Sequence, residues 1–426
     1  MSPASRASSV TCLGCGCACD DLTVEVADGR ITDISPPCPV GRAWFGDGRV
    51  PGRILRGGAE ASLEAALAEA AETLAGARGG ALVLVAPDLS TQGQRAALAV
   101  ADVLRAAVDT ATSEPAAAGL LAAQRRGRAA ATLGEVRNRA DVLLFWGVDP
   151  AMRYPRFLAR YAVDPVGTHV PGGRAGRTVI SVSIGRDRGP APADSELALA
   201  PDQEIAALSV MRAVALGNAL GELPPPLQAA AEVATRLATA AYAVLVHDGE
   251  PGEEPGRDAY RAEGLIALTQ ALNGRTRAAL STLRAGGNRS GAEAALTWQT
   301  GYPMAVSYRA GYPRYMPASR GLAELGAGGA GAILVAGSAA AFADALAGAG
   351  PRTPVIAIGP RASEAPFPVR VAIDTGVAGI HEGGTAYRMD EVPLPLRPPL
   401  GGARSAADTL AALLGAVRAR RTGRTA

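Results

Sequence analysis

The pattern of hydrophobic and polar residues changes once along this 426-residue chain, near residue 52. Before that point, apolar residues occupy every second position of residues 22–26 and recur at 31 and 34, with the pair Asp28-Gly29 between the two segments. Alternation with a period of two indicates strands, and an Asp-Gly pair between two such strands is typical of a tight turn. We therefore expect a β-hairpin within residues 21–34.

After a segment rich in glycine and arginine at residues 52–58, which we expect to be a linker, helix-length and strand-length segments alternate. Residues 63–75 and 92–107 have the pattern of helices. Short, continuous apolar runs predict buried strands at residues 81–86, 141–146, 179–182, 243–247, 332–336, 355–358 and 369–373. Strands separated by helices predict an α/β fold of parallel sheets flanked by helices, preceded here by a small β-rich domain.

The order of these strands suggests two sheets. The runs that begin at residues 81, 141 and 179 would form one sheet, and those at 243, 332 and 355 a second. The predicted domains are therefore residues 1–52, residues 53–225, residues 226–400, and a C-terminal helix with a basic tail at 401–426. Ligands of parallel sheets bind beyond the carboxyl ends of the strands, and residues 147–150 and 337–338 occupy that position.

Composition indicates an ordinary folded protein, with 48% hydrophobic and 19% charged residues. The net charge of +2 does not favour nucleic acid or an anionic membrane as a partner. The first ten residues are polar and no hydrophobic signal segment follows them, and no apolar run is long enough to span a membrane. The cytoplasm is the expected location.

The chain contains no lysine, because all 42 basic residues are arginine. A P-loop for nucleotide phosphates needs a Gly-Lys-Ser/Thr ending, and pyridoxal phosphate is attached through a lysine Schiff base. Both kinds of site are therefore excluded.

The candidate metal ligands lie at the amino terminus, where all five cysteines fall between residues 12 and 38. Cys12, Cys15 and Cys19 have the spacing C-x2-C-x3-C, and Cys38 precedes a proline. Three close thiolates and one distant partner suit a [4Fe-4S] cluster, which takes four cysteine ligands. A four-cysteine zinc site or an empty site are the alternatives. Cys17 falls outside the pattern and is expected to be a small packing residue.

Four segments resemble the B subunit of the formylmethanofuran dehydrogenases, within the molybdopterin oxidoreductases. They are residues 12–21, residues 132–141 together with 145–150, residues 296–303 together with 311–315, and residues 384–390. The resemblance covers most of the chain. It implies the α/β fold of that superfamily and a [4Fe-4S] cluster beside a molybdopterin or tungstopterin centre that interconverts carbon dioxide and formate.

The resemblance also implies a metal ligand that this chain lacks. In the redox members, a cysteine followed by histidine holds the metal just ahead of the Thr-Leu-Gly-Glu segment. Residues 113–127 occupy that place here and contain neither residue type. Alanine and proline cannot bind a soft metal or transfer a proton, so the pterin-bound metal is expected to be lost. Ser113 or Glu114 remains a possible substitute ligand.

That departure resembles the formyltransferase/hydrolase complex of methylotrophs, whose B subunit is structural. The expected function is thus a non-redox B subunit in tetrahydromethanopterin-linked one-carbon metabolism, in a complex that releases formate. Its expected partners are an amidohydrolase-like A subunit, a formyltransferase D subunit and a C-like subunit. The alternatives are a redox-active dehydrogenase subunit with an altered ligand, and an electron-transfer module that carries the cluster alone.

Three residues are candidates for a vestigial pterin pocket. Gly147 and Asp149 follow a predicted strand, and Arg284 lies roughly where the family places an arginine near the metal. Asp149 could equally be a turn residue before Pro150, and Arg284 a packing cation.

The remaining candidates have weaker signals. The three histidines, at positions 169, 247 and 381, match no catalytic or metal spacing and are expected in loops or at strand ends. Residues 298–315 concentrate five aromatic side chains, for which contact between subunits is favoured over a local core; these are Trp298, Tyr302, Tyr308, Tyr312 and Tyr315.

Overall fold

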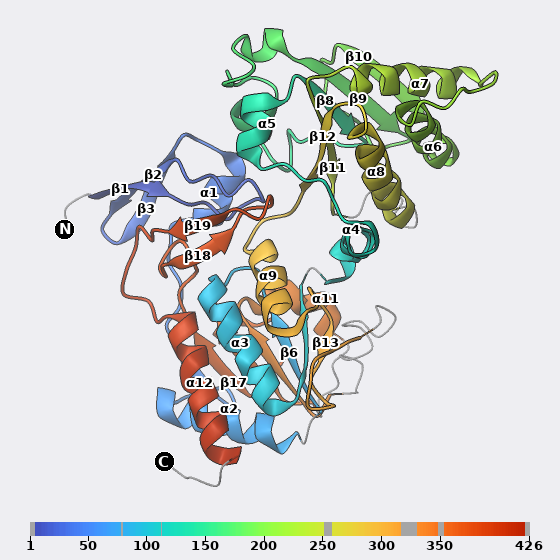
Figure 1. The fold of residues 1–426 in the computed structure, drawn as a ribbon. Coiled ribbons are helices and arrows are strands. Elements are labelled where there is room, and N and C mark those ends of the chain that lie inside the picture. Colours follow the sequence, from blue (N-terminus) through green and yellow to red (C-terminus); the bar gives the residue numbers. More distant parts are fainter. Residues whose placement is uncertain are drawn as a thin grey trace. The chain divides into compact units, whose positions relative to one another are not determined.

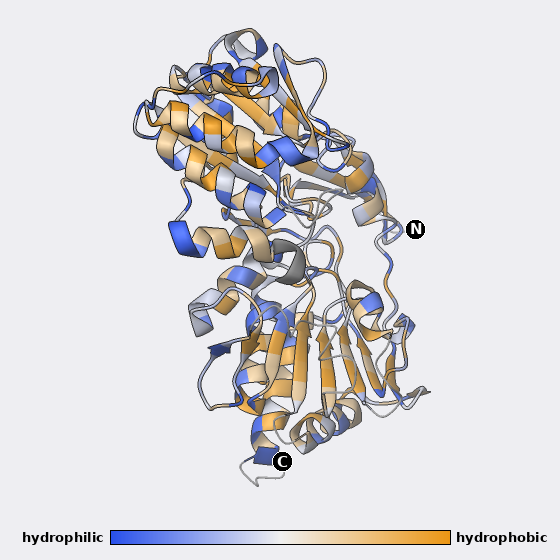
Figure 2. Ribbon diagram, turned by 90° about the vertical axis from the view of Figure 1, so that its right-hand side faces the viewer, coloured by the Kyte–Doolittle hydropathy of each residue, from blue (hydrophilic) through white to orange (hydrophobic). Residues whose placement is uncertain are grey.

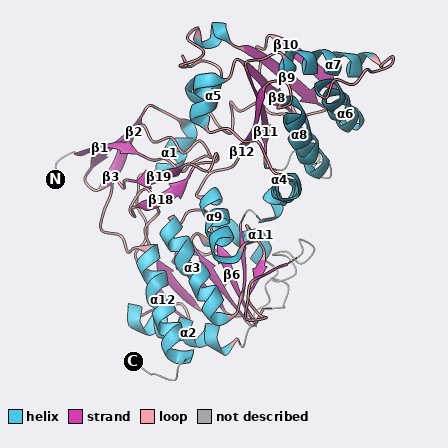
Figure 3. Ribbon diagram, in the orientation of Figure 1, coloured by secondary structure: helices cyan, strands magenta, loops and turns pink. Residues whose placement is uncertain are grey.

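The computed structural model describes residues 5–77, 80–111, 113–250, 258–316, 330–347 and 353–421 (Figure 1). The chain divides into two compact units. Unit 1 comprises Met1–Glu114 and Gly286–Ala426, and unit 2 comprises Pro115–Ala285. Both units combine parallel strands with helices (Figure 3), which confirms the predicted α/β class.

Unit 1 is built from the two ends of the chain. Its elements are β1 (Ser5–Val10), β2 (Leu22–Ala27), β3 (Arg30–Ser35), α1 (Pro39–Phe45), β4 (Ile54–Arg56), β5 (Ala59–Glu60), α2 (Leu63–Gly76), β6 (Ala81–Val85), α3 (Thr91–Leu104), β7 (Ala107–Thr110), α9 (Arg289–Thr300), β13 (Val306–Ser307), β14 (Arg314–Tyr315), β15 (Ala332–Ala336), α11 (Ala343–Leu346), β16 (Val355–Gly359), β17 (Val371–Asp374), β18 (Gly384–Tyr387), β19 (Pro393–Leu396) and α12 (Ala406–Arg421).

A nine-stranded sheet forms the centre of unit 1, in the order β14-β13-β7-β6-β15-β16-β17-β4-β5. The five strands from β7 to β17 are mutually parallel, whereas the outer strands pair antiparallel. The chain leaves β6 towards β7 and returns at β15 on the other side of β6. The crevice beyond the carboxyl ends of β6 and β15 is therefore the switch point at which parallel sheets bind ligands.

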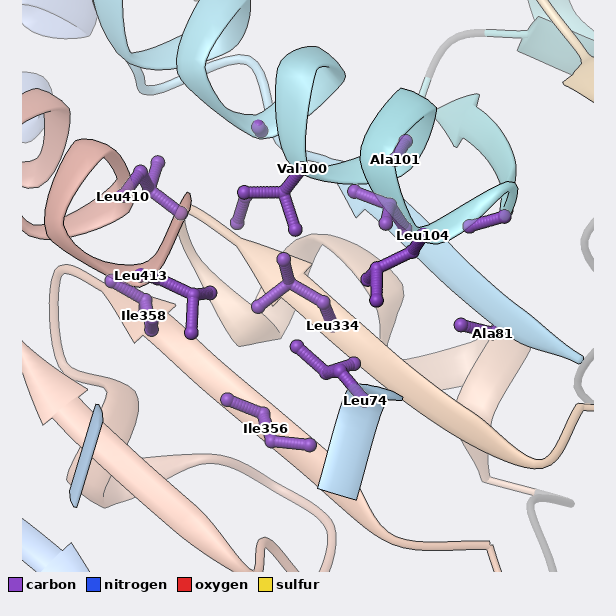
Figure 4. Packing of buried hydrophobic residues seen from close by; sticks show 14 of the residues in the cluster. Leu74, Ala81, Val100, Ala101, Leu104, Leu334, Ile356, Ile358, Leu410 and Leu413 are labelled. Carbon is purple, nitrogen blue, oxygen red and sulfur yellow. The ribbon is translucent and has the colours of Figure 1, made fainter. Parts of the chain in front are cut away.

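Helices α2, α3 and α12 cover one face of this sheet and bury its largest hydrophobic cluster (Figure 4). Leu104 of α3 and Leu413 of α12 pack with Leu334 of β15 and Ile356 of β16, and all four are at most 7% exposed. Burying a leucine or isoleucine side chain contributes about 1.5–3 kcal/mol. The C-terminal helix, predicted within residues 401–426, is thus part of the core, and residues 422–426 of the predicted tail lie outside the described residues.

The predicted hairpin is confirmed as β2 and β3, with β1 as a third antiparallel strand on β2. Asp28 and Gly29 both have positive φ angles, 48° and 70°, as a two-residue hairpin turn requires. The small sheet belongs to the same compact unit as the nine-stranded sheet. Residues 54–56 of the expected linker form β4, which pairs with β17.

Unit 2 contains a five-stranded parallel sheet, in the order β10-β9-β8-β11-β12. Its elements are α4 (Ser113–Arg126, which begins two residues before the unit), α5 (Leu133–Arg139), β8 (Val142–Trp146), β9 (Thr178–Ile184), β10 (Ser195–Leu199), α6 (Glu204–Ala215), α7 (Pro225–Ala238), β11 (Tyr242–Asp248), α8 (Asp258–Leu272) and β12 (Arg277–Leu283). In Figure 2 the strands of each unit are coloured mainly as hydrophobic, whereas the helices carry both hydrophobic and hydrophilic residues.

The predicted assignment of strands to sheets is wrong. The strand at residue 81 pairs with those at 332 and 355, and the strand at 141 with those at 178 and 242. The predicted boundary at 225/226 consequently falls inside unit 2, at the start of α7. Parallel strands are joined by long connections, so that a whole unit fits between β7 and β15 without disturbing either sheet. Because the apolar runs have similar compositions, the sequence of a run does not predict which sheet it joins.

No helix among the described residues is long and apolar enough to cross a membrane.

Candidate functional site

The cysteine loop, residues 11–21, connects β1 to β2 in unit 1. Its ends are tied together because the Cys12 amide donates to the Cys19 carbonyl at 2.9 Å. Inside the loop, the Ala18 amide donates to the Cys15 carbonyl at 3.1 Å, and the Gly14 amide donates to the sulfur of Cys12 at 3.3 Å. The loop therefore curls around its own thiols.

The hairpin and helix α1 return Cys38 to this loop. Cys38 immediately precedes α1, and its carbonyl accepts a hydrogen bond from the Arg42 amide at 2.8 Å. A side chain placed on Gly41 would lie 3.6 Å from both the sulfur of Cys12 and the Cβ of Cys38. Gly41 therefore lies beside both Cys12 of the triplet and its distant partner Cys38.

Burial raises the pKa of the Cys12 thiol to about 12, although the Gly14 hydrogen bond lowers it. Cys15, Cys19 and Cys38 each raise it further by repulsion between neighbouring thiolates. Cys15, Cys19 and Cys38 therefore each lie within electrostatic range of Cys12. Cys17 is fully buried, and its role as a packing residue stays a prediction.

The cysteine loop rests on two other segments of unit 1. The Gly287 amide donates to the Leu13 carbonyl at 2.7 Å, and the Met389 amide donates to the Gly16 carbonyl at 3.0 Å. A Cβ on Gly286 would lie only 2.3 Å from the Gly14 carbonyl oxygen, so that only glycine allows this approach. Parts of the chain that are far apart in sequence thus support the loop.

Across the parts of the chain that the structure describes, no three His, Cys, Asp or Glu side chains are arranged to hold one metal ion. A cluster differs from a single ion because each thiolate binds an iron of its own, and the four sulfurs surround a larger volume.

The switch point of unit 1 is occupied by polar groups that bind the main chain. Both carboxylate oxygens of Asp88, beyond β6, accept hydrogen bonds from the Ser338 amide at 2.9 and 3.1 Å. A Cβ on Gly337 would lie 2.6 Å from the carboxylate, and this residue has a φ of +97°. Burial raises the pKa of Asp88 to about 6, although the amide hydrogen bonds oppose the shift.

Asn288 connects the same region to the segment behind the cysteine loop and is fully buried. Its amide nitrogen lies within hydrogen-bonding distance of the Leu89 carbonyl, the Thr91 hydroxyl and the Gln94 amide oxygen, at 3.0–3.1 Å. Its amide oxygen accepts a hydrogen bond from the Tyr387 amide at 2.7 Å. The side chain thus joins the loop after β6, the start of α3 and β18.

The candidates after β8 in unit 2 lie where the sequence predicted, beyond the carboxyl end of a strand. Gly147 has a φ of +59°. Asp149 is exposed, and its carboxylate accepts a hydrogen bond from the Ala151 amide at 3.0 Å. A hydrogen bond to the amide two residues further on is typical of a turn residue, which is the alternative role that the sequence predicts for Asp149.

Buried charges that the sequence patterns did not predict lie in the same unit. Arg261 of α8 binds Glu204 of α6 at 2.5 Å and Asp187 at 2.9 Å, and Glu204 also accepts a hydrogen bond from the Trp146 indole at 2.9 Å. Glu204 is fully buried. The signal was present in the sequence, because Arg261 lies on the same helical face as Leu265 and Leu268, where a core residue is expected.

Arg284 lies in a small pocket of unit 2 that is lined by basic side chains, at the carboxyl ends of β11 and β12. A small cavity of about 30 Å³ is lined by Arg284, Arg128, His247 and Thr282 among others. The His247 ring lies 3.0 Å from the Thr282 hydroxyl. Burial, followed by the nearby guanidinium groups, lowers the pKa of His247 to about 3, so the ring is neutral at pH 7. The cavity has room for one or two water molecules.

The chain resembles known proteins over nearly its whole length. It is 31% identical to the B subunit of tungsten-containing formylmethanofuran dehydrogenase 2 of Methanocaldococcus jannaschii, over 92% of this chain and 94% of that protein. The protein of the same name from Methanococcus maripaludis is 29% identical, over 91% and 93%. This chain belongs to the B-subunit family of the formylmethanofuran dehydrogenases. No family model matches the chain.

The chain is also similar to a subunit of a formyltransferase/hydrolase complex. The Fhc B subunit of the formyltransferase/hydrolase complex of Methylorubrum extorquens is 30% identical, over 62% of this chain and 67% of that protein. A solved structure, the formyltransferase/hydrolase complex FhcABCD of the same organism with methylofuran, contains a chain with a TM-score of 0.70 and 26% identity. The match covers 87% of this chain and 99% of that one.

In this member of the family, the segment in which a metal ligand was expected forms α4. Between residues 113 and 127 the chain has no cysteine or histidine. The side chains of Ser113 and Glu114, named as substitute ligands, lie outside the described residues.

The histidines lie in loops and near strand ends, as expected. His169 is exposed, His247 precedes the last residue of β11, and His381 follows β17 with its ring bound to the Gly48 carbonyl and the Val377 amide. Among the five clustered aromatic residues, Tyr308 is buried in the core and the Tyr302 and Tyr315 rings stack at 5.9 Å. Trp298 and Tyr312 are more than half exposed.

Proposed function

We propose that this chain is the B subunit of a multi-subunit complex in tetrahydromethanopterin-linked one-carbon metabolism, and that it has a structural role in a formyltransferase/hydrolase assembly that releases formate. Amidohydrolase-like A, C-like and formyltransferase D subunits would be its partners. The family membership and the similarity to a chain of FhcABCD support this proposal.

The observation that carries the non-redox role is the missing metal ligand. All five cysteines precede residue 39, and residues 113–127 contain no cysteine or histidine. Tungsten and molybdenum in such centres need a soft or anionic protein ligand, which alanine does not supply. The tungsten-containing relative is 31% identical over 92% of this chain and the Fhc B subunit 30% identical over 62%, so the non-redox role is proposed from the ligand set and not from overall similarity.

We infer that Cys12, Cys15, Cys19 and Cys38 hold a [4Fe-4S] cluster. A [4Fe-4S] cluster takes four cysteine ligands, and Cys15, Cys19 and Cys38 each lie within electrostatic range of Cys12, which supports this donor set. Three of the four residues are buried and Cys15 is partly exposed, so the protein shields the site from water on most sides. When bound, the cluster would supply one-electron transfer or a structural cross-link.

The residues of unit 2 do not favour a retained pterin. The Asp149 carboxylate binds the turn that follows it, and the cavity at Arg284 is far smaller than the 300–1,000 Å³ of typical cofactor pockets. Gly147, Asp149 and Arg284 would then be remnants of a pterin pocket.

A redox-active dehydrogenase subunit is the second candidate, because two relatives are named as tungsten-containing enzymes. An electron-transfer module that carries the cluster alone is the third, because the four thiols are present.

Metal analysis of the purified complex tests these proposals. We expect about four iron atoms per chain, less than a tenth of an equivalent of tungsten or molybdenum, and formate release without an electron acceptor. Cys12→Ser should lose iron, whereas the control Cys17→Ala should keep it. Stoichiometric tungsten would overturn the non-redox role, and zinc in place of iron would overturn the cluster.

A further inference from the structure

A short hairpin at one edge of the nine-stranded sheet carries features that the proposals above do not use. It consists of β13 and β14, and we call residues 306–315 the edge hairpin. Strand β13 pairs with β7, and within the described part of the chain β14 pairs with β13 alone. Among the residues that the structure describes, one side of β14 is therefore a sheet edge without a paired strand, and proteins normally protect such an edge or use it for contact.

The base of the edge hairpin is firmly held. Val306 is fully buried, and the Tyr308 ring is 4% exposed in the core. The Tyr308 amide donates to the Ala106 carbonyl at 3.0 Å, and the Met316 amide donates to the Ala305 carbonyl at 2.7 Å. These contacts fix the backbone on both sides of the turn, so the tip does not need to be ordered by a partner.

The tip presents an aromatic side chain between two cations. Tyr312 is 59% exposed, and Arg309 and Arg314 on either side of it are also exposed. No ion pair joins either guanidinium to a carboxylate of any residue that the structure describes. By comparison, the surface residue Arg42 of unit 1 is paired with Asp33 at 3.0 Å. The tip therefore has positive charge that no carboxylate of the described residues balances.

We propose that the edge hairpin is a docking surface for an acidic patch on another protein of the complex. Tyrosine and arginine are the residue types that dominate the centres of protein interfaces, and a pre-ordered loop loses little entropy on binding. The two uncompensated cations select a partner surface rich in Asp and Glu. A second copy of this chain would bring cations against cations if it bound through the same tip. This inference rests on the proposed membership in a complex.

The test uses the full chain, co-expressed with the A, C and D subunits of its own organism. We expect Arg309→Glu/Arg314→Glu to lower the recovery of at least one of these partners by tenfold or more, and Tyr312→Ala by three- to tenfold. Arg309→Lys/Arg314→Lys should retain most of the recovery, because the charge is kept. Tyr260→Ala, on α8 of unit 2, is the matched control for loss of an exposed tyrosine.

The outcomes separate this inference from the proposed function. If the wild-type chain recovers none of the three partners, the proposed complex fails. If the wild-type chain assembles and the charge-reversed variant assembles equally well at physiological salt, the docking surface is refuted while the complex stands. If the variants abolish only self-association of this chain, the occupant is a second copy and the inference is wrong. Thermal unfolding of each variant shows whether it is folded.

Discussion

The carboxyl ends of the two parallel sheets satisfy their buried polar groups in different ways. In unit 1, the Asp88 carboxylate and the Asn288 side chain bind mainly backbone amides and carbonyls. In unit 2, Arg261 binds the carboxylates of Glu204 and Asp187. The same position in the fold is therefore stabilised by main-chain dipoles in one unit and by full charges in the other.

This difference has an energetic consequence. A side chain that binds main-chain groups leaves neutral donors and acceptors behind when it is removed, at about 1–3 kcal/mol for each buried group. A partner removed from a buried ion pair leaves an uncompensated charge, at about 3–5 kcal/mol. Unit 2 should therefore be more sensitive than unit 1 to the loss of a single polar side chain.

The largest effect is expected for Glu204→Ala. The change leaves Arg261 buried without its closest carboxylate and removes the acceptor of the Trp146 indole. We expect the free energy of unfolding of unit 2 to fall by about 3–5 kcal/mol, measured by urea unfolding with peptide-resolved proteolysis. Glu196→Ala, at an exposed carboxylate of β10, is the control and should change little. A loss below about 1 kcal/mol would show that the ion pairs contribute little.

Asn288→Ala tests the corresponding position in unit 1. The variant leaves the Leu89 carbonyl and the Tyr387 amide without this partner inside the protein. The expected loss is about 2–4 kcal/mol in the unfolding free energy of unit 1, by the same measurement. Asn218→Ala, at an exposed position, should be neutral. A larger loss than that of Glu204→Ala would reverse the comparison between the units.

His247 predicts how unit 2 responds to acid. Its pKa is about 3 in the folded state and about 6.5 when unfolded. The unfolded chain therefore binds the proton first, and the stability of unit 2 should fall as pH decreases through 6.5. Between pH 7 and pH 4 the loss attributable to His247 is about 3 kcal/mol. His247→Gln should remove most of this pH dependence, whereas His169→Gln, at an exposed ring, should leave it unchanged. Equal pH dependence in both variants would contradict the assignment to His247.

Asp88 predicts a smaller effect of opposite sign in unit 1. Its pKa is raised from 3.8 to about 6, so the folded state binds the proton first and loses stability as pH rises through this range. Asp88→Asn should stabilise unit 1 by about 1–2 kcal/mol at pH 8 and have little effect at pH 4. Urea unfolding at both pH values measures the difference, and Asp408→Asn on the exposed start of α12 is a control. Stabilisation at pH 4 alone would show that the sign is wrong.

Much of the fold could be predicted from local patterns. The Asp28-Gly29 turn, the strands at residues 81 and 332 and the C-terminal helix follow from periodicity and turn chemistry, which act over a few residues. The helix predicted at residues 92–107 extends too far at its C-terminal end. Arg105 has a left-handed backbone conformation that ends α3, and β7 begins at residue 107. The strand β12 at Arg277–Leu283 was missed entirely. Its first residue is an exposed arginine, and the alternation of Ala, Ser and Thr gave a weak apolar signal.

For the candidate site too, local sequence predicts one part and does not predict another. The spacing of Cys12, Cys15, Cys19 and Cys38 predicts a group of thiols, and three of them raise the pKa of Cys12; that the four bind one cluster stays a prediction. The support for their loop comes from Gly286, Gly287 and Met389, which lie more than 240 residues away. No local pattern marks such contacts, because a glycine needed for close approach looks like any other glycine.

The sequence by itself determined most of the segments that form strands and helices, the spacing of the four candidate thiols, and that no cysteine or histidine occupies the expected metal-ligand segment. These properties depend on neighbours along the chain or on residue type alone. Only the tertiary structure decided which strands share a sheet, that unit 2 interrupts unit 1, and that buried carboxylates surround Arg261. Those arrangements depend on packing between distant segments, and a parallel sheet accepts any connection long enough to return to the same edge.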